Sequence, residues 1–156
     1  MKKIMVFGSF DHLHPGHINF FRQAKEHGTY LLVAVARDAT IKQIKGRLPV
    51  FTEDERMQHL MAIPDVDEVV LGYPDDKFKV IEENRPDIIC LGHDQHVFAD
   101  RLPEELRRRG LDIPVVRLKA YRRDIYQSSH FRKNSWDLNS PEDLNRKHDA
   151  LKRTIK

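Results

Sequence analysis

The sequence has few of the residues and patterns that define several large classes of protein. Its 156 residues include a single cysteine, Cys90, so the chain cannot close an internal disulfide, and this composition fits a reducing compartment. Every apolar run is far shorter than the roughly 20 residues that a membrane-spanning helix needs, and the run after Met1-Lys2-Lys3 is too short for a signal peptide. We therefore expect a soluble, cytoplasmic protein with no membrane partner.

Aromatic residues that can stack on bases are scarce as well. The chain has four tyrosines and one tryptophan, and it lacks the aromatic–basic interleaving that single-strand binders use. Its net charge of +3 and pI of about 9 suit nucleotides and phosphorylated metabolites as well as they suit nucleic acid. We expect small phosphorylated molecules as partners, and no nucleic acid.

Short apolar runs alternate with helical patterns along most of the chain, whose length and 40% hydrophobic content suit one domain. Strands are predicted where apolar residues run continuously, and helices where they recur at helical spacing between turn signals. The strands are expected at 4–7, 30–36, 67–71, 88–91 and 113–118, and the helices at 15–27, 53–63, 77–84 and 104–109. This alternation predicts an α/β fold, a Rossmann-like, doubly wound, five-stranded parallel sheet with helices on both faces.

The first predicted strand runs into an unusual loop between Gly8 and His17. Pro15 suits the first turn of a helix, and Gly16 lets another group approach the backbone closely. Because His14 and His17 are three residues apart, both side chains should lie on one face of that turn. Two imidazoles beside free backbone N–H groups, at the positive end of a helix dipole, form a site for phosphate oxygens.

Two other interpretations of these histidines stay open at this point. His12, His14 and His17 are close enough in sequence to bind a metal ion together, although no cysteine or further histidine follows at a zinc-like spacing. His14 and His17 are also placed to cap the helix and do nothing more. Phosphate binding remains the preferred interpretation.

The residues Gly8-Ser9-Phe10-Asp11 and His14-Pro15-Gly16-His17 resemble the HxGH signature of the nucleotidyltransferase superfamily, in particular its cytidylyltransferase-like branch. The resemblance covers a predicted domain at 1–131 and implies transfer of a nucleoside monophosphate from a nucleoside triphosphate to a phosphorylated acceptor, with release of pyrophosphate. It implies catalytic roles for His14 and His17. It also implies that a nucleotide binds the rest of the loop: Gly8, Ser9, Phe10, Gly16 and Asp11, with Asp11 orienting the loop or a metal-bound water.

Basic residues further along the chain have both plain and functional interpretations. The stretch from Ile41 to Pro49 is predicted as a solvated connection or, because the superfamily carries basic residues there, as a segment in which Lys45 or Arg47 leans over the triphosphate. Thr52 and Glu55 form a capping box, and Arg56 follows in the first turn, where a cation opposes the helix dipole. The resemblance places a functional arginine at Arg56, so we expect a substrate contact or a structural role.

A second strand-to-loop junction lies at Gly92-His93-Asp94-Gln95. Polar residues after a buried strand would face the same crevice as the histidines, although Asp94 also suits a plain turn or helix cap. The stretch matches three of the four residues of the G-Y-D-Q motif in archaeal-type FAD synthetases. This resemblance implies that Asp94 binds the nucleotide through its ribose or base.

A third polar stretch begins after the last predicted strand, at Tyr121. The superfamily places an R-T-x-G-I-S-T-T motif here, and Arg122 lines up with its arginine although the glycine of the motif is missing. The resemblance implies that Tyr121, Arg122, Ser128 and Ser129 hold the triphosphate, with Arg122 catalytic and Arg123 a competitor for its role. Beyond this stretch, 132–156 is predicted to be a C-terminal helical extension.

The resemblance leads to ATP and FMN as the first expected substrate pair, with FAD as the product. CTP with glycerol 3-phosphate or another polyol or sugar phosphate is the alternative, and a non-catalytic nucleotide-binding module is a third. A phosphate monoester has a second pKa of about 6, so the acceptor needs no general base at neutral pH. We expect Mg²⁺ to be held by the phosphates without dedicated protein ligands, and the branch often forms homodimers.

Overall fold

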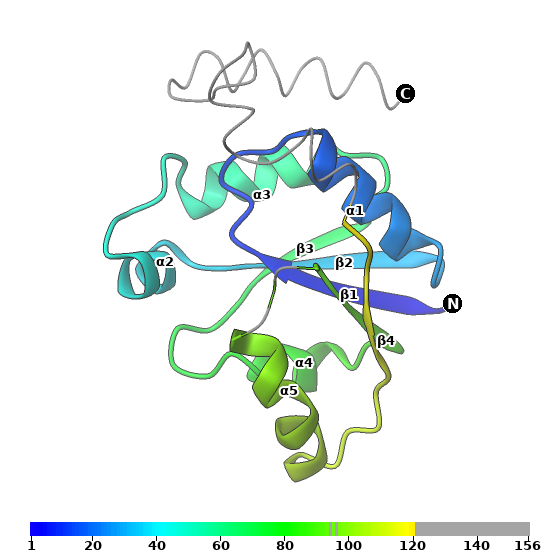
Figure 1. Cartoon of the computed structure of the whole chain (residues 1–156). Coiled ribbons are helices and arrows are strands. Elements are labelled where there is room, and N and C mark those ends of the chain that lie inside the picture. The colour runs from blue at the N-terminus through cyan, green and yellow to red at the C-terminus, as the bar shows by residue number, and fades with distance from the viewer. Residues whose placement is uncertain (94, 96, 121–156) are drawn as a thin grey trace.

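In a computed structural model, residues 1–93, 95 and 97–120 are described, and five parallel strands in this part of the chain form one sheet of order β3-β2-β1-β4-β5 (Figure 1). The strands are β1 (Lys3–Gly8), β2 (Tyr30–Val35), β3 (Glu68–Leu71), β4 (Ile88–Leu91) and β5 (Val115–Arg117). The helices are α1 (Pro15–Lys25), α2 (Asp38–Lys45), α3 (Glu53–Met61), α4 (Lys79–Asn84) and α5 (Val97–Arg108). Within the same residues, no helix is both long and apolar enough to cross a bilayer.

Helices cover both faces of the sheet, as the sequence predicted. Alternate residues of a strand point to opposite faces, so Ile4 of β1 packs in one buried cluster and Met5 in another. The first cluster includes Phe21 of α1 and Leu60 of α3, and the second includes Leu102 of α5. Figure 1 shows α1 and α3 on one face and α4 and α5 on the other. Burial from both sides explains why these strands are continuous apolar runs.

The central strand β1 marks the point where the order of the sheet reverses. It pairs with β2 on one side, through Lys3 and Tyr30, and with β4 on the other, through Ile4 and Ile88. Ligands of open parallel sheets bind outside the carboxyl ends of the strands at such a switch point. A ligand-binding site is therefore expected at the loops that leave β1 and β4.

The prediction that residues 41–49 form a plain connection was wrong in its first half. Helix α2 spans Asp38–Lys45 and ends at Gly46, whose φ of +79° is the left-handed conformation that glycine favours. The helix has eight residues, of which Thr40 and Ile41 are buried. Two neighbouring buried residues do not show a helical period in the sequence. Two helices, α2 and α3, therefore connect β2 to β3 in place of the single helix expected.

Two smaller expectations also need correction. Helix α5 begins at Val97, seven residues before the predicted start at 104, and Pro103 lies inside it. The apolar pattern of the helix at 53–63 predicts that Leu60 and Met61 both face the core, yet the Met61 side chain is 51% exposed at the last residue of α3. Leu60 is fully buried, so one residue of this pair supplies the packing.

Candidate active site

The loop between β1 and α1 is folded around a buried phenylalanine. Phe10 is 6% exposed, has a φ of +50°, and its ring contacts Phe21 at a centroid distance of 5.3 Å. A Cβ atom on Gly8 would lie 2.7 Å from the Phe10 ring, so glycine is required there by close packing. The side chain of Phe10, an expected nucleotide contact, therefore belongs to the core, and its backbone remains on the loop.

His14 and His17 form a reciprocal cap at the start of α1. The Gly16 N–H donates to His14 Nδ1 at 3.0 Å, and the His14 N–H donates to His17 Nδ1 at 3.3 Å. The two ring centroids are 4.0 Å apart, so the histidines share one face as predicted. A ring nitrogen that accepts a hydrogen bond carries no proton, and each neutral imidazole therefore presents its N–H at Nε2.

This cap changes the predicted anion site in one respect. The sequence suggested free backbone N–H groups at the helix start, but the Gly16 N–H is bound by His14, and the His17 N–H donates to the His14 carbonyl at 2.9 Å. Capping and anion binding are nevertheless compatible, because the cap uses Nδ1 and leaves the proton of each neutral ring on Nε2. The imidazole Nε2–H groups are thus the donors that this helix start offers to a phosphate.

Burial lowers the pKa of His17 well below its usual value, and the charges of His14 and His12 lower it further. The edge of the His17 ring also packs on Phe10, with centroids 5.5 Å apart. His17 is therefore neutral at physiological pH. It can bind a phosphate oxygen as a fixed hydrogen-bond donor, in the single tautomer that the cap selects.

Asp11 fastens this loop to the segment before α3. Its Oδ2 accepts from the Val50 N–H at 2.7 Å and its Oδ1 from the Phe51 N–H at 2.9 Å. Both carboxylate oxygens therefore orient the chain, which is one of the two roles expected for this residue. Its contact with a nucleotide stays a prediction.

Arg56 lies beneath the same loop with a fully buried side chain. Its guanidinium donates to the carbonyls of Ser9, Ala36 and Phe51 at 2.8, 2.7 and 3.1 Å. It also donates to the Asp38 carboxylate at 2.7 Å. The arginine thus connects the ends of β1 and β2 to the starts of α2 and α3. Of the two roles expected for Arg56, the structural one explains why a cation stands in the first turn of α3.

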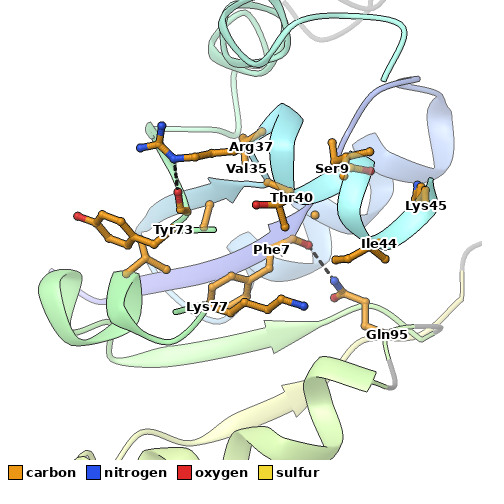
Figure 2. Close-up of a pocket in the computed structure, with 16 residues that line it drawn as sticks. Phe7, Ser9, Val35, Arg37, Thr40, Ile44, Lys45, Tyr73, Lys77 and Gln95 are labelled. Atoms are coloured by element: carbon orange, nitrogen blue, oxygen red, sulfur yellow. Dashed lines mark hydrogen bonds between the residues drawn. The ribbon is translucent and has the colours of Figure 1, made fainter. Parts of the chain in front are cut away.

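A pocket of about 260 Å³ opens beside this loop, at the carboxyl ends of β1, β2 and β3 (Figure 2). The side chains of Arg37, Lys45 and Lys77 bring three cations to its walls. Ser9 lines it from the β1 loop, and Tyr73 lines it from the end of β3. Apolar side chains make up much of the remaining lining: Phe7, Ala34, Val35, Ile41, Ile44 and Val80.

Gln95 closes the pocket at the switch point. Its Nε2 donates to the Phe7 carbonyl at 2.9 Å, and its Oε1 accepts from the Gly92 N–H at 2.7 Å, so it bridges the ends of β1 and β4. Arg117 of β5 donates to the carbonyls of Gly92 and Gln95 at 2.8 and 2.9 Å. Gly92 and Gln95 are thus anchored to β1, β4 and β5.

Residues 5–134 match the family described as cytidylyltransferase-like. The chain belongs to the cytidylyltransferase-like family. It is 46% identical over 121 residues to an FAD synthase of Aciduliprofundum boonei (strain DSM 19572 / T469), covering 78% of this chain and 80% of that protein. It is 40% identical over 136 residues to an FAD synthase of Picrophilus torridus (strain ATCC 700027 / DSM 9790 / JCM 10055 / NBRC 100828 / KAW 2/3), covering 87% and 97%.

Two solved structures resemble this chain in fold. A crystal structure of a lipopolysaccharide core biosynthesis protein from Thermoplasma volcanium GSS1 is 36% identical, with a TM-score of 0.73 over 78% of this chain and 98% of that chain. The pantoate-beta-alanine ligase of Francisella tularensis is 13% identical, with a TM-score of 0.58 over 96% and 78%. At that identity the second likeness shows the shared fold alone.

Several residues that the sequence suggested for a cytidylyltransferase-like site lie outside the described residues: Asp94, Tyr121, Arg122, Arg123, Ser128 and Ser129. The C-terminal extension at 132–156 also lies outside them. Where the structure is described, no three His, Cys, Asp or Glu side chains form a group suited to a metal ion. The histidines, Ser9, Lys45 and the pocket therefore belong to the described part of the candidate site.

Sequence reasoning missed three pocket residues of this cytidylyltransferase-like chain: Arg37, Tyr73 and Lys77. Arg37 and Tyr73 each lie two residues beyond the end of a strand, β2 and β3 respectively, and position near a strand end is a signal that applies to every strand of a parallel sheet. Lys77 lies in a turn before α4, and nothing in the local sequence predicts that it reaches the pocket.

Proposed function

We propose that this chain is an FAD synthase, which transfers AMP from ATP to the phosphate of FMN and releases pyrophosphate. The apolar pocket beside the histidine loop carries the choice of acceptor. An isoalloxazine ring buries apolar surface in such a pocket, whereas glycerol 3-phosphate has almost none to bury. The FAD synthases of Aciduliprofundum boonei and Picrophilus torridus, at 46% and 40% identity, support the same assignment.

The chemical step is a single displacement at phosphorus. A phosphate oxygen of FMN forms a bond to the α-phosphorus of ATP, and the bond from that phosphorus to the α,β-bridging oxygen breaks, which releases pyrophosphate with its electron pair. FMN is mostly dianionic at neutral pH, so no side chain needs to remove a proton. Catalysis then rests on alignment of the two substrates and on stabilisation of negative charge.

His14 and His17 stabilise that charge through their Nε2–H groups. Each ring is fixed by a hydrogen bond at Nδ1, so the donors are oriented before the substrate arrives. Donors that need no reorientation contribute more to a transition state than flexible ones. ATP enters as its magnesium complex, in which the phosphates are the principal ligands of the metal.

The remaining nucleotide contacts follow from the predicted motifs. Ser9 and the backbone of the β1 loop near Gly8 bind the phosphates, Gly16 has no side chain to block their approach, and Lys45 reaches the same region from the end of α2. Asp94 binds the adenosine. The triphosphate end is held by residues beyond the described part of the chain: Arg122, Ser128 and Ser129, with Tyr121 and Arg123 beside them. A homodimer stays a prediction.

A matrix of substrates tests this assignment. Each of the four nucleoside triphosphates is paired with FMN, glycerol 3-phosphate, phosphopantetheine or a sugar phosphate in the presence of Mg²⁺, and pyrophosphate release is measured together with the product by chromatography. We expect ATP with FMN to give FAD at the highest rate. Turnover of CTP with glycerol 3-phosphate but not of FMN would favour the polyol alternative, and no pyrophosphate from any pair would favour a non-catalytic module.

A further inference from the structure

Lys77 lies in the pocket wall between two residues that one arginine holds. The Nη2 atom of Arg109, the residue that follows α5, lies 3.0 and 3.2 Å from the two carboxylate oxygens of Asp76. The same guanidinium lies over the Phe78 ring, with its Cζ atom 5.6 Å from the ring centroid. Arg109 therefore contacts the neighbours of Lys77 on both sides.

The turn that carries Lys77 is fixed by further contacts of these neighbours. Asp76 Oδ1 accepts from the Phe78 N–H at 3.1 Å, and the Phe78 side chain is 5% exposed within the α4 and α5 core. Partial burial would raise the pKa of Asp76, but the hydrogen bonds from Phe78 and Arg109 outweigh it and hold the pKa below its usual value. The carboxylate is thus charged at neutral pH and keeps its ion pair with Arg109.

The two ends of the pocket differ in what surrounds them. At one end, Tyr73 follows β3 and the Arg37 Nε donates to the Gly72 carbonyl at 2.7 Å. At the other end, Gln95 bridges β1 and β4 at the switch point. Figure 2 shows the amino group of Lys77 directed toward Gln95 and away from Tyr73. Lys77 therefore presents its charge to the end at which the sheet reverses.

This difference orients an acceptor that has an aromatic end and a phosphate end. The aromatic end suits the Tyr73 side, away from the switch point, and the phosphate end suits the side of Gln95 and Ser9, which adjoins the histidine loop. A lysine ammonium binds a phosphate as a compact point charge. Lys77 reaches this end from the α4 side of the pocket, while Lys45 approaches from α2.

We propose that Lys77 binds the phosphate of the acceptor, and that Arg109 is a positioning residue that keeps Lys77 at the switch point. This inference rests on the proposed function, in which the acceptor is FMN. Lys77 touches the reacting phosphate, whereas Arg109 acts through Asp76 and Phe78 and does not reach the pocket itself.

Flavin fluorescence gives a direct test, because FMN and riboflavin differ only in the phosphate. Dissociation constants of both flavins are measured by titrating the full-length protein and the variants Lys77→Met, Lys77→Arg and Lys42→Met. We expect Lys77→Met to bind FMN about tenfold more weakly, because one partly exposed charge-assisted hydrogen bond is lost. The dissociation constant of riboflavin should not change. Lys77→Arg keeps the charge and should recover most of the affinity, and Lys42→Met removes an exposed α2 lysine outside the pocket as a matched control.

The positioning role is tested by coupling between the two residues. We expect Arg109→Met to weaken FMN binding about threefold, with no further loss when it is combined with Lys77→Met. Asp76→Asn removes the same ion pair, while its amide oxygen still accepts from the Phe78 N–H. It should weaken FMN binding as Arg109→Met does, and it replaces Arg109→Met in the test if that variant does not fold. Glu82→Gln, which changes another Arg109 partner away from the turn, is the control and should leave FMN binding unchanged.

The outcomes separate this inference from the proposed function. If the wild-type protein forms no FAD in the substrate matrix, the proposed function fails. If it forms FAD but Lys77→Met binds FMN normally, or loses riboflavin and FMN equally, the phosphate contact of Lys77 is wrong. Additive losses in Arg109→Met and Lys77→Met would overturn the positioning role of Arg109.

Discussion

The histidine loop and the pocket wall hold their polar groups in opposite ways. In the loop, Asp11, His14 and His17 are each hydrogen-bonded to backbone N–H groups, and Phe10 buries the centre. In the wall, the Lys45 and Lys77 side chains are exposed at the ends of flexible stems. The difference suggests that the fixed donors serve chemistry, which needs precise geometry, and that the adaptable cations serve acceptor binding.

The largest effect is expected when the support beneath the loop is removed. Arg56→Met leaves the carbonyls of Ser9, Ala36 and Phe51 without a buried donor, and we expect the free energy of unfolding to fall by about 3 kcal/mol. Urea denaturation measures the change, with Arg22→Met, an exposed arginine on α1, as the control. A loss below about 0.5 kcal/mol, the usual scale for a surface site, would mean that the loop is not supported in this way.

Substitutions of His17 separate its donor role from its capping role. His17→Ala removes both, and we expect turnover to fall by about two to three orders of magnitude. His17→Asn keeps an acceptor near the Nδ1 position for the His14 N–H but loses the Nε2–H donor. It should therefore lose turnover like the alanine variant while retaining more of the melting temperature.

Single-turnover formation of FAD and thermal melting are the two measurements. Product release does not limit a single turnover, so this rate reports the chemical step. An unchanged single-turnover rate in His17→Asn would remove His17 from catalysis and leave it as a cap.

The packing of Gly8 against Phe10 gives a smaller effect on stability. In Gly8→Ala the new Cβ would lie 2.7 Å from the Phe10 ring, and overpacking of this kind costs about 1–3 kcal/mol. Replacing the Phe10 ring by the smaller leucine side chain in Gly8→Ala/Phe10→Leu should relieve the clash. The free energy of unfolding of the double variant should therefore fall by less than the sum of the two single changes. Chemical denaturation of all four proteins measures this coupling, and simple additivity would show that the contact does not constrain the loop.

The sequence predicted those parts of the structure whose cause is local. Strands buried on both faces appear as apolar runs, and the HxGH loop carries its glycine, proline and histidines within ten residues. Helix α2 was missed because eight residues with two buried side chains show no clear period. The partners of Asp11 lie 39 and 40 residues away, so its role as a clamp depended on the folded chain. The same holds for Lys77, which lines the pocket between Asp76 and Phe78, two residues that the distant Arg109 contacts.

The smallest expected effect is a dependence of stability on pH that belongs to His17. Its pKa is lowered in the folded protein, chiefly by burial and then by the charges of His14 and His12, so the unfolded chain binds its proton more readily. Stability should therefore be constant above the unfolded pKa of about 6.5 and should fall as the pH drops below it, by at most about 1.4 kcal/mol per pH unit for this one group.

His17→Asn has no titrating group at this position, so its stability should fall less than that of the wild type between about pH 6.5 and 5. Parallel urea denaturation series over that range measure the difference. Identical pH profiles would mean that His17 is not held neutral by its surroundings. His17 would then bind a proton as readily in the folded protein as in the unfolded chain. The loop would not hold a fixed neutral donor, and in this respect it would not differ from the pocket wall.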